Sequence, residues 1–224
     1  MDIEFDKRPA LQYHWAKELR LDIKAVIFDY GQVISYPQDP ATIDALARIA
    51  GVARDKFEPV LWSLRGEYDR GTIGAREYYR DVLSRIGADL DDEGLDEMAR
   101  VDAVSWTNIN AGTVTLMEDV KKAGYVLGIL SNMPYDFLDW ARANFPVFSL
   151  PHVGIFSCEL KLIKPEPAIY ERMLSMLGLK GGELVFFDDR EENVAGAKAL
   201  GINAFIWESP ESARRELKSL GVKL

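Results

Sequence analysis

Five short, almost uninterrupted runs of apolar residues divide the chain, and segments with helical periodicity lie between them. An apolar run without polar alternation is typical of a strand buried on both faces, as in a parallel sheet covered by helices. Strands and helices that alternate in this way predict an α/β protein with a doubly wound parallel sheet. The predicted strands are residues 25–28, 125–130, 153–156, 184–187 and 204–207.

The intervening segments predict helices, one of which has clear start and stop signals. Ser209 and Pro210 open the last helix and Gly221 ends it. The other predicted helices are 114–122, 135–144, 167–177 and 193–200.

Residues 41–106 break the alternation, because they contain no convincing strand and several helical faces. So long a helical interval exceeds an ordinary crossover between strands. We expect a helical bundle inserted after the first strand, where it would lie over the ligand crevice of an α/β sheet as a lid. The expected boundaries are 1–23 for an N-terminal extension, 24–38 and 107–224 for the core domain, and 39–106 for the helical cap domain.

The scarcity of histidine and cysteine excludes several chemistries. Cys158 has no partner for an internal disulfide, which favours a reducing compartment, and we expect a cytoplasmic protein. With His14 and His152 alone, Cys/His zinc sites are excluded, and without a GxSxG motif a Ser-His-Asp hydrolase is disfavoured. Carboxylate and lysine chemistry remains.

Charge and hydropathy limit the partners. The chain has 36 acidic and 27 basic residues, a net charge of −9, which argues against nucleic-acid binding. No apolar stretch reaches the roughly 18 residues of a membrane span, so we expect no membrane insertion. Residues 1–23 carry charges and lack the apolar core of a signal peptide; residues 9–21 could form a short helix packed on the body or on a partner subunit.

Polar residues follow four of the predicted strands, where parallel strands bring their carboxyl ends to one edge. Any one of them could simply cap the next helix, but the ordered set places carboxylates, a hydroxyl and a lysine in one crevice. Such a set suits phosphoryl transfer: carboxylates hold Mg²⁺, lysine and hydroxyl bind phosphate oxygens, and one carboxylate attacks phosphorus. The residues are Asp29, Ser131, Asn132, Lys164, Asp188 and Asp189.

With these motifs the chain resembles the haloacid dehalogenase superfamily from about residue 23 to 207. Asp29 matches the nucleophile, Ser131 the second motif, Lys164 the third, and Asp188 and Asp189 followed by Asn193 the fourth. The resemblance implies a Rossmann-like core with a helical cap of the C1 type. Within the superfamily, the segments around Asp29 and Asp188 look most like the alpha-D-glucose-1-phosphate phosphatase group, and more distantly like the phosphatase domain of soluble epoxide hydrolases.

The resemblance implies a Mg²⁺-dependent phosphatase of small phosphorylated metabolites, sugar phosphates above all, that acts through an aspartyl-phosphate. It makes Asp29 and Lys164 catalytic, and assigns phosphate binding to Ser131, Asn132 and Lys164. It assigns metal binding to Asp29, the carbonyl of Gly31, and Asp188 and Asp189, with Asp189 the preferred direct ligand. Monomer and homodimer both remain open.

Two departures from the family pattern leave alternatives open. Gly31 stands where phosphatases of this family carry an acid/base aspartate, and it cannot transfer a proton. A dehalogenase and a catalytically weak, ligand-binding relative therefore remain alternatives. A response-regulator receiver is disfavoured, because its acidic pair comes first in the chain, whereas here the pair comes last. Lys161 lies three residues before Lys164, and we prefer Lys164 because it precedes the Pro-Glu-Pro turn.

The predicted bundle carries polar side chains that could face the crevice and select a substrate. An ordinary solvated helix surface is the favoured interpretation, and Cys158 is expected to be packed and inert. The polar residues concerned are Arg65, Tyr68, Asp69 and Arg70.

Overall fold

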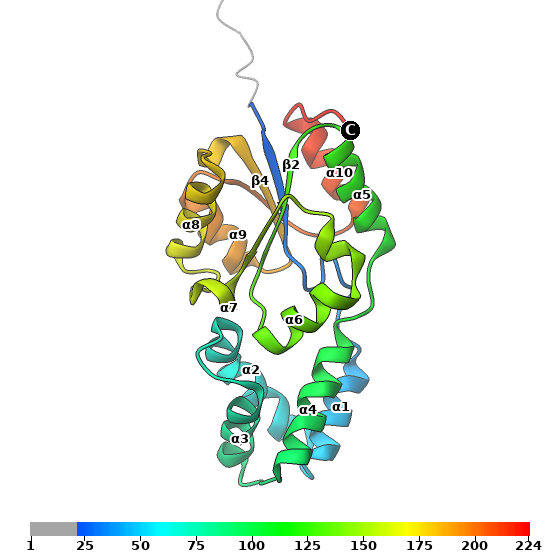
Figure 1. The fold of residues 1–224 in the computed structure, drawn as a ribbon, viewed down its shortest axis with the longest axis vertical. Coiled ribbons are helices and arrows are strands. Elements are labelled where there is room, and N and C mark those ends of the chain that lie inside the picture. The colour runs from blue at the N-terminus through cyan, green and yellow to red at the C-terminus, as the bar shows by residue number, and fades with distance from the viewer. Residues whose placement is uncertain (1–21) are drawn as a thin grey trace, which may run out of the picture.

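The computed structural model describes residues 22–224, which form a five-stranded parallel sheet flanked by helices, with four further helices at one end (Figure 1). The strand order is β3-β2-β1-β4-β5, and every neighbouring pair is parallel. The predicted doubly wound α/β fold is confirmed. The predicted helix over residues 9–21 lies outside the described residues. The strands are β1 (Ala25–Phe28), β2 (Val126–Ser131), β3 (Val153–Phe156), β4 (Leu184–Asp188) and β5 (Asn203–Ile206).

The central strand explains why the sequence runs are continuously apolar. All four residues of β1 are fully buried, and they alternate between two hydrophobic clusters, one on each face of the sheet. Val26 and Phe28 pack on one side, and Ala25 and Ile27 on the other. A polar residue at any of these positions would therefore be desolvated whichever face it pointed to.

Helices cover both faces of the sheet. The cluster on one face includes side chains of α5 (Ala111–Lys122), α6 (Tyr135–Asn144) and α10 (Pro210–Ser219). The other face is covered by α8 (Pro167–Leu177) and α9 (Glu191–Ala199), seen in yellow and orange in Figure 1. The remaining short elements are α7 (Ser157–Leu160) and the 3₁₀ turns η1 (Pro146–Ser149) and η2 (Gly181–Glu183).

Between β1 and β2 the chain forms four helices with a hydrophobic cluster of their own, which we call the helical insertion (residues 40–105). Buried aromatic residues dominate this cluster: Phe57, Tyr78 and Tyr79 are each fully buried. The insertion thus has the apolar interior that its sequence periodicity predicts. Its helices are α1 (Pro40–Ile49), α2 (Arg54–Arg70), α3 (Ala75–Ile86) and α4 (Asp92–Ser105).

Two antiparallel segments connect the insertion to the sheet. Ser35 forms an isolated β-bridge with Ile109, and the Tyr36 N–H donates to the carbonyl of Asn108 at 2.8 Å. These segments place the insertion beyond the carboxyl ends of the strands, as Figure 1 shows. In the described part of the chain, no helix combines the length and apolar character that crossing a membrane requires.

Candidate active site

A buried lysine joins two carboxylates at the carboxyl edge of the sheet. The Nζ of Lys164 lies 2.8 Å from Oδ1 of Asp29 and 2.6 Å from Oδ2 of Asp188, and it also donates to the carbonyl of Leu130 at 3.1 Å. The N–H of Asp29 donates to the Phe187 carbonyl, which continues the β1–β4 ladder and fixes the aspartate at the strand end. The three charged side chains predicted from separate motifs therefore meet.

Two consecutive aspartates, Asp188 at the end of β4 and Asp189 directly after it, have different surroundings. Asp188 is fully buried; its Oδ1 accepts from Asn193 Nδ2 and from the Arg190 N–H, both at 2.9 Å, while its Oδ2 accepts from Lys164. Asp189 is more accessible, and its Oδ2 accepts from Nε2 of Gln32 at 2.7 Å. Asp188 is thus held by protein donors on both oxygens, whereas Asp189 keeps more of its coordination free.

Three carboxylates and one ammonium group leave this cluster with an excess of negative charge. Carboxylate oxygens of Asp29, Asp188 and Asp189 all lie within 4.8 Å of one another. Burial, with the neighbouring charge of Asp188, raises the pKa of Asp29 to about 7 although Lys164 opposes the shift. Burial and the charge of Asp188 also raise the pKa of Asp189, to about 6. For Lys164, burial favours the neutral amine, but the charges of Asp188 and Asp29 outweigh it and raise the pKa.

Ser131, the last residue of β2, and Asn132, which follows it, have different contacts. The Ser131 side chain is buried and lines the cavity described below, and its hydroxyl makes no hydrogen bond within residues 22–224. Asn132 braces the backbone of Lys164: its Oδ1 accepts from the Lys164 N–H at 2.8 Å, and its Nδ2 donates to the Lys164 carbonyl at 2.9 Å. The role predicted for Asn132 in phosphate binding stays a prediction, and the structure adds a bracing role.

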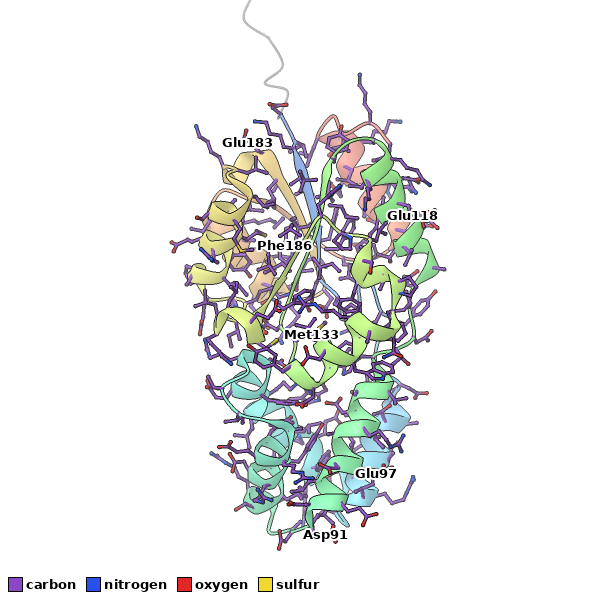
Figure 2. The ribbon with its side chains drawn as sticks, in the orientation of Figure 1. Asp91, Glu97, Glu118, Met133, Glu183 and Phe186 are labelled. Carbon is purple, nitrogen blue, oxygen red and sulfur yellow. The ribbon has the colours of Figure 1, made fainter. Side chains whose placement is uncertain are left out.

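A cavity of about 570 Å³ opens beside the cluster, where the sheet meets the helical insertion. In Figure 2, Met133, one of its lining residues, lies at this junction, while Glu183 marks the opposite end of the sheet and Asp91 the far tip of the insertion. Asp29, Ser131, Lys164 and Asp189 line the cavity as well. The predicted catalytic and binding residues thus share one space with residues of the insertion.

Trp106, just after α4, packs beside Gly31. A Cβ atom on Gly31 would lie 3.5 Å from Cζ3 of the indole, which lines the cavity. The tryptophan is fixed at both ends: the Tyr30 hydroxyl donates to its carbonyl at 2.8 Å, and its Nε1 donates to Oδ1 of Asp102 at 3.2 Å. An aromatic ring therefore stands beside the position from which the family's acid/base side chain would extend.

The interpretation of the α2 polar residues as a solvated surface is wrong. Arg65 and Asp69 line the cavity, with side chains 13% and 16% exposed, and Arg65 Nε donates to Asp69 Oδ1 at 2.8 Å. Tyr68 is buried, and Arg70 contacts the core. Packing of the insertion against the core buries this face of α2. The sequence of the helix alone does not show that contact.

A buried carboxylate in α4 organises the insertion side of the cavity. Asp102 accepts hydrogen bonds from the Arg65 guanidinium at 2.6 Å, the Tyr79 hydroxyl at 2.9 Å, Gln38 Nε2 at 3.0 Å and the Trp106 indole. Neither Asp102 nor Trp106 was predicted as a site residue. Trp62, Arg65, Gly66 and Asp69 do carry a signal, because their spacing places them on one face of a helix.

Comparison with curated proteins finds relatives along the chain. Phosphatase MT3486 of Mycobacterium tuberculosis is 25% identical over 215 residues, which cover 91% of this chain and 98% of the relative. Sesquiterpene phosphatase astK of Aspergillus oryzae is 26% identical and covers 80% of this chain and 87% of its own length. Bifunctional epoxide hydrolase 2 of Mus musculus is 30% identical over 64% of this chain, but this chain spans only 27% of that protein.

Solved structures share the fold. The HAD-family enzyme BT-2542 of Bacteroides thetaiotaomicron, determined with magnesium and inorganic phosphate, is 23% identical with a TM-score of 0.67, covering 84% of this chain and 95% of its own. The L-2-haloacid dehalogenase of Xanthobacter autotrophicus, with covalently bound chloropropionic acid, has a TM-score of 0.64 at 23% identity. The match covers 90% of this chain and 85% of the dehalogenase chain. Residues 23–201 match the haloacid dehalogenase-like hydrolase model, and this chain therefore belongs to the haloacid dehalogenase-like hydrolase family.

Proposed function

We propose that this hydrolase is a Mg²⁺-dependent phosphatase of small phosphorylated metabolites, sugar phosphates among them, that acts through an aspartyl-phosphate on Asp29. The observation that carries the proposal is the cluster in which Asp29, Asp188 and Asp189 gather around Lys164 at the edge of the cavity. A lone cysteine favours the cytoplasm as its compartment.

The donor set suits a magnesium ion. Three carboxylates offer hard oxygen ligands, and burial together with the charge of Asp188 raises the pKa values of Asp29 and Asp189. A divalent cation would offset this unfavourable concentration of negative charge. We assign the ion to Asp29, Asp189 and the carbonyl of Gly31, with Asp188 as a weaker candidate because both its oxygens already accept protein hydrogen bonds. When bound, the ion would neutralise charge on the phosphoryl group and its carboxylate neighbours.

Asp29 is the proposed nucleophile. Its Oδ1 forms an ion pair with Lys164 and accepts from the Tyr30 N–H at 2.7 Å, and no described residue donates to its Oδ2. An oxygen of Asp29 attacks phosphorus as the bond to the leaving-group oxygen breaks, and water then hydrolyses the aspartyl-phosphate. Lys164 and the Ser131 hydroxyl bind the phosphoryl oxygens, and Asn132 holds the Lys164 backbone in place while it contributes to that site.

Gly31 restricts the leaving groups. No side chain at position 31 can protonate the departing oxygen, and Trp106 stands beside that position. Substrates with good leaving groups, such as anomeric or acyl phosphates, need the least acid assistance. We propose that the helical insertion acts as the cap that covers such a substrate, with 24–38 and 107–224 as the core domain and 39–106 as the cap domain.

The first experiment replaces the nucleophile. We expect Asp29→Asn to lower kcat for p-nitrophenyl phosphate by roughly a thousandfold or more in Mg²⁺, because the amide cannot form the aspartyl-phosphate. Asp139→Asn, at an exposed position on α6 away from the cavity, serves as the control and should keep full activity. Turnover that survives in the Asp29 variant would rule out this nucleophile.

The Gly31 observation also favours a second candidate, a catalytically weak ligand-binding relative. It would bind sugar phosphates without hydrolysing p-nitrophenyl phosphate in Mg²⁺. A dehalogenase would instead release halide from a 2-haloacid in the presence of a chelator. The three carboxylates are difficult to explain for that reaction, which needs no metal to hold them together.

A further inference from the structure

One face of α2 forms the wall of the cavity that belongs to the insertion. Trp62, Arg65, Gly66 and Asp69 lie along it at helical spacing and line the cavity together with the catalytic cluster. The groups proposed to bind and transfer the phosphoryl group, Asp29, Ser131 and Lys164, come from the core and not from α2. This face of α2 is therefore placed to contact the part of a substrate that lies beyond the phosphate.

Aromatic surface is the first property of this part of the cavity. Trp62 is 41% exposed although it is large and apolar, and its ring lies 5.8 Å from the Arg65 guanidinium carbon. Trp106 adds a second indole, which its bonds to Tyr30 and Asp102 hold in place. Flat, fixed aromatic faces are suited to packing against the C–H face of a ring, with little loss of side-chain entropy.

Paired hydrogen-bonding groups are the second property. Arg65 Nε and Asp69 Oδ1 satisfy each other, while Asp69 Oδ2 and Arg65 Nη2 have no hydrogen-bond partner within residues 22–224. The cavity wall therefore offers an acceptor and a donor next to each other. A hydroxyl both donates and accepts, so neighbouring hydroxyls on a ring can form hydrogen bonds with both Asp69 Oδ2 and Arg65 Nη2. An aromatic ring without hydroxyls leaves both atoms without a partner.

Charge is the third property. The charged residues that line the cavity are Asp29, Arg65, Asp69, Lys164, Asp189 and Arg190. Arg65 is paired with Asp69 and Asp102, whereas Arg190, at the rim, is 63% exposed and forms only a surface ion pair with Glu192. Lys164 serves the phosphate site, so among residues 22–224 no unpaired cation lines the cavity beside α2, and a second anionic group there would meet the carboxylate of Asp69.

We propose that the site selects monophosphate esters of an uncharged, hydroxyl-bearing sugar ring. The ring packs on Trp62 and Trp106, and its hydroxyls form hydrogen bonds with Asp69 Oδ2 and Arg65 Nη2. This inference rests on the proposed phosphatase function and narrows its substrates. It disfavours bisphosphates and phosphorylated sugar acids whose second anion lies beside α2, because the carboxylate of Asp69 repels that anion.

The test compares kcat/KM in Mg²⁺ for substrates that each lack or add one recognition element; phenyl phosphate also has the better leaving group, which works against the expected preference and makes that comparison the more stringent. Glucose 1-phosphate and glucose 6-phosphate supply the neutral ring, glycerol 3-phosphate removes the ring, phenyl phosphate removes the hydroxyls, and glucose 1,6-bisphosphate adds an anion. We expect the better glucose monophosphate to exceed each of the other three by about tenfold or more.

Two substitutions assign the preference to residues. Trp62→Ala should lower kcat/KM for the glucose monophosphates by about three- to tenfold, and by less for glycerol 3-phosphate. Asp69→Asn should narrow the gap between glucose monophosphate and bisphosphate by about tenfold, because it removes the repelling charge. Trp140→Ala is the matched control: Trp140 is 42% exposed on α6, outside the cavity, and its loss should change neither ratio.

The outcomes separate the two proposals. If glycerol 3-phosphate or phenyl phosphate is hydrolysed in an Asp29-dependent way as well as the glucose monophosphates, the phosphatase stands and the sugar-ring inference is overturned. Equal rates on the bisphosphate, or a Trp62→Ala variant that affects all substrates alike, overturn it too. If no phosphomonoester is hydrolysed, both proposals fail.

Discussion

At the scale of single residues, the site holds together groups that repel one another. Lys164 bridges Asp29 and Asp188, yet a third carboxylate, Asp189, remains close by without an equivalent cation. Burial makes each unmatched negative charge costly, which is why the pKa values of Asp29 and Asp189 are raised. The arrangement suits catalysis at the expense of the stability of the metal-free protein.

This imbalance predicts a pH-dependent stability of the metal-free protein. Asp29 has an ordinary pKa of 3.8 and a folded-state pKa of about 7, so between these values the native state binds a proton that the unfolded state has lost. Stability should therefore fall as pH rises from about 4 to about 7, in a thermal melt with chelator. Asp29→Asn should weaken this fall, because the amide does not ionise.

Magnesium should act in the opposite direction at neutral pH. We expect Mg²⁺ to raise the Tm of the wild-type protein, and to raise that of Asp29→Asn by less, since one ligand is lost. Asp139→Asn should behave like the wild type in both series. If the melts of wild type and Asp29→Asn were superimposable with and without Mg²⁺, Asp29 would be neither strained nor a metal ligand.

The sequence predicted that the polar residues near the ends of the strands lie together, while their roles stay predictions. Asp29, Ser131, Lys164 and Asp188 could be brought together because parallel strands deliver their carboxyl ends to one edge, which is a property of the fold class. Trp106 and the α2 wall could not, because their positions depend on how the insertion rests on the core. No local pattern in the sequence encodes that packing angle.

At the scale of elements, the end of α2 is attached to the core next to the catalytic lysine. Arg70 forms a two-pronged ion pair with Glu166, with N–O distances of 2.6 and 3.0 Å, and Glu166 lies two residues after Lys164. The Ser157 hydroxyl donates to the Asp69 carbonyl, and Lys161 donates to the carbonyl of Gly71. These bonds hold the α2 wall of the cavity against the core.

Loss of the Arg70–Glu166 ion pair should weaken substrate binding more than it slows the chemical step. We expect Arg70→Ala to raise KM by about three- to tenfold with a smaller change in kcat, because the insertion spends less time closed over the substrate. Steady-state kinetics of the variant with glucose 1-phosphate measure the two parameters separately.

Arg76→Ala provides the comparison for Arg70. Arg76, like Arg70, forms two short charged contacts, but its partners are two carboxylates, Asp92 and Asp96, and both lie within the insertion. Its removal should leave KM unchanged. An equal rise in KM for both variants would mean that Arg70 acts through the stability of the insertion and not through its attachment.

Element boundaries show which sequence signals are strong. The strands β1 and β3 and the helices α6 and α8 begin and end as predicted, because apolar runs and proline or polar caps coincide there. Helix α5 begins earlier than predicted, since Asn110 caps it by accepting from the Gly112 and Thr113 N–H groups. The three additional residues, 111–113, make up less than one helical turn and carry no large apolar side chain that periodicity could detect.

At the scale of the whole molecule, three hydrophobic clusters divide the described residues. Two flank the sheet, and the third, which includes Phe57 and Leu61, lies inside the insertion. The insertion joins the rest through two short strand-like segments and the contacts at the end of α2. We therefore predict that the insertion can lose structure while the sheet stays folded.

A cavity-forming substitution tests this independence. Phe57 is fully buried, and Phe57→Ala should cost about 3–5 kcal/mol of stability in the insertion. Hydrogen exchange should then accelerate across α1–α4 while the amides of β1 and β4 keep their protection. Equal acceleration in the strands would show that insertion and sheet unfold as one cooperative unit.

The contact between Trp106 and Gly31 also constrains how this enzyme can evolve. An aspartate at position 31 would have to share the space beside the indole, and a smaller residue at 106 would remove one of the donors that Asp102 accepts from. A Cβ at position 31 would meet the indole at an ordinary contact distance, but the carboxylate beyond it would compete for the same space, so we expect the effect of a substitution at either position to depend on the residue at the other. The leaving-group preference proposed from Gly31 and the aromatic wall formed by Trp106 would then change together in evolution.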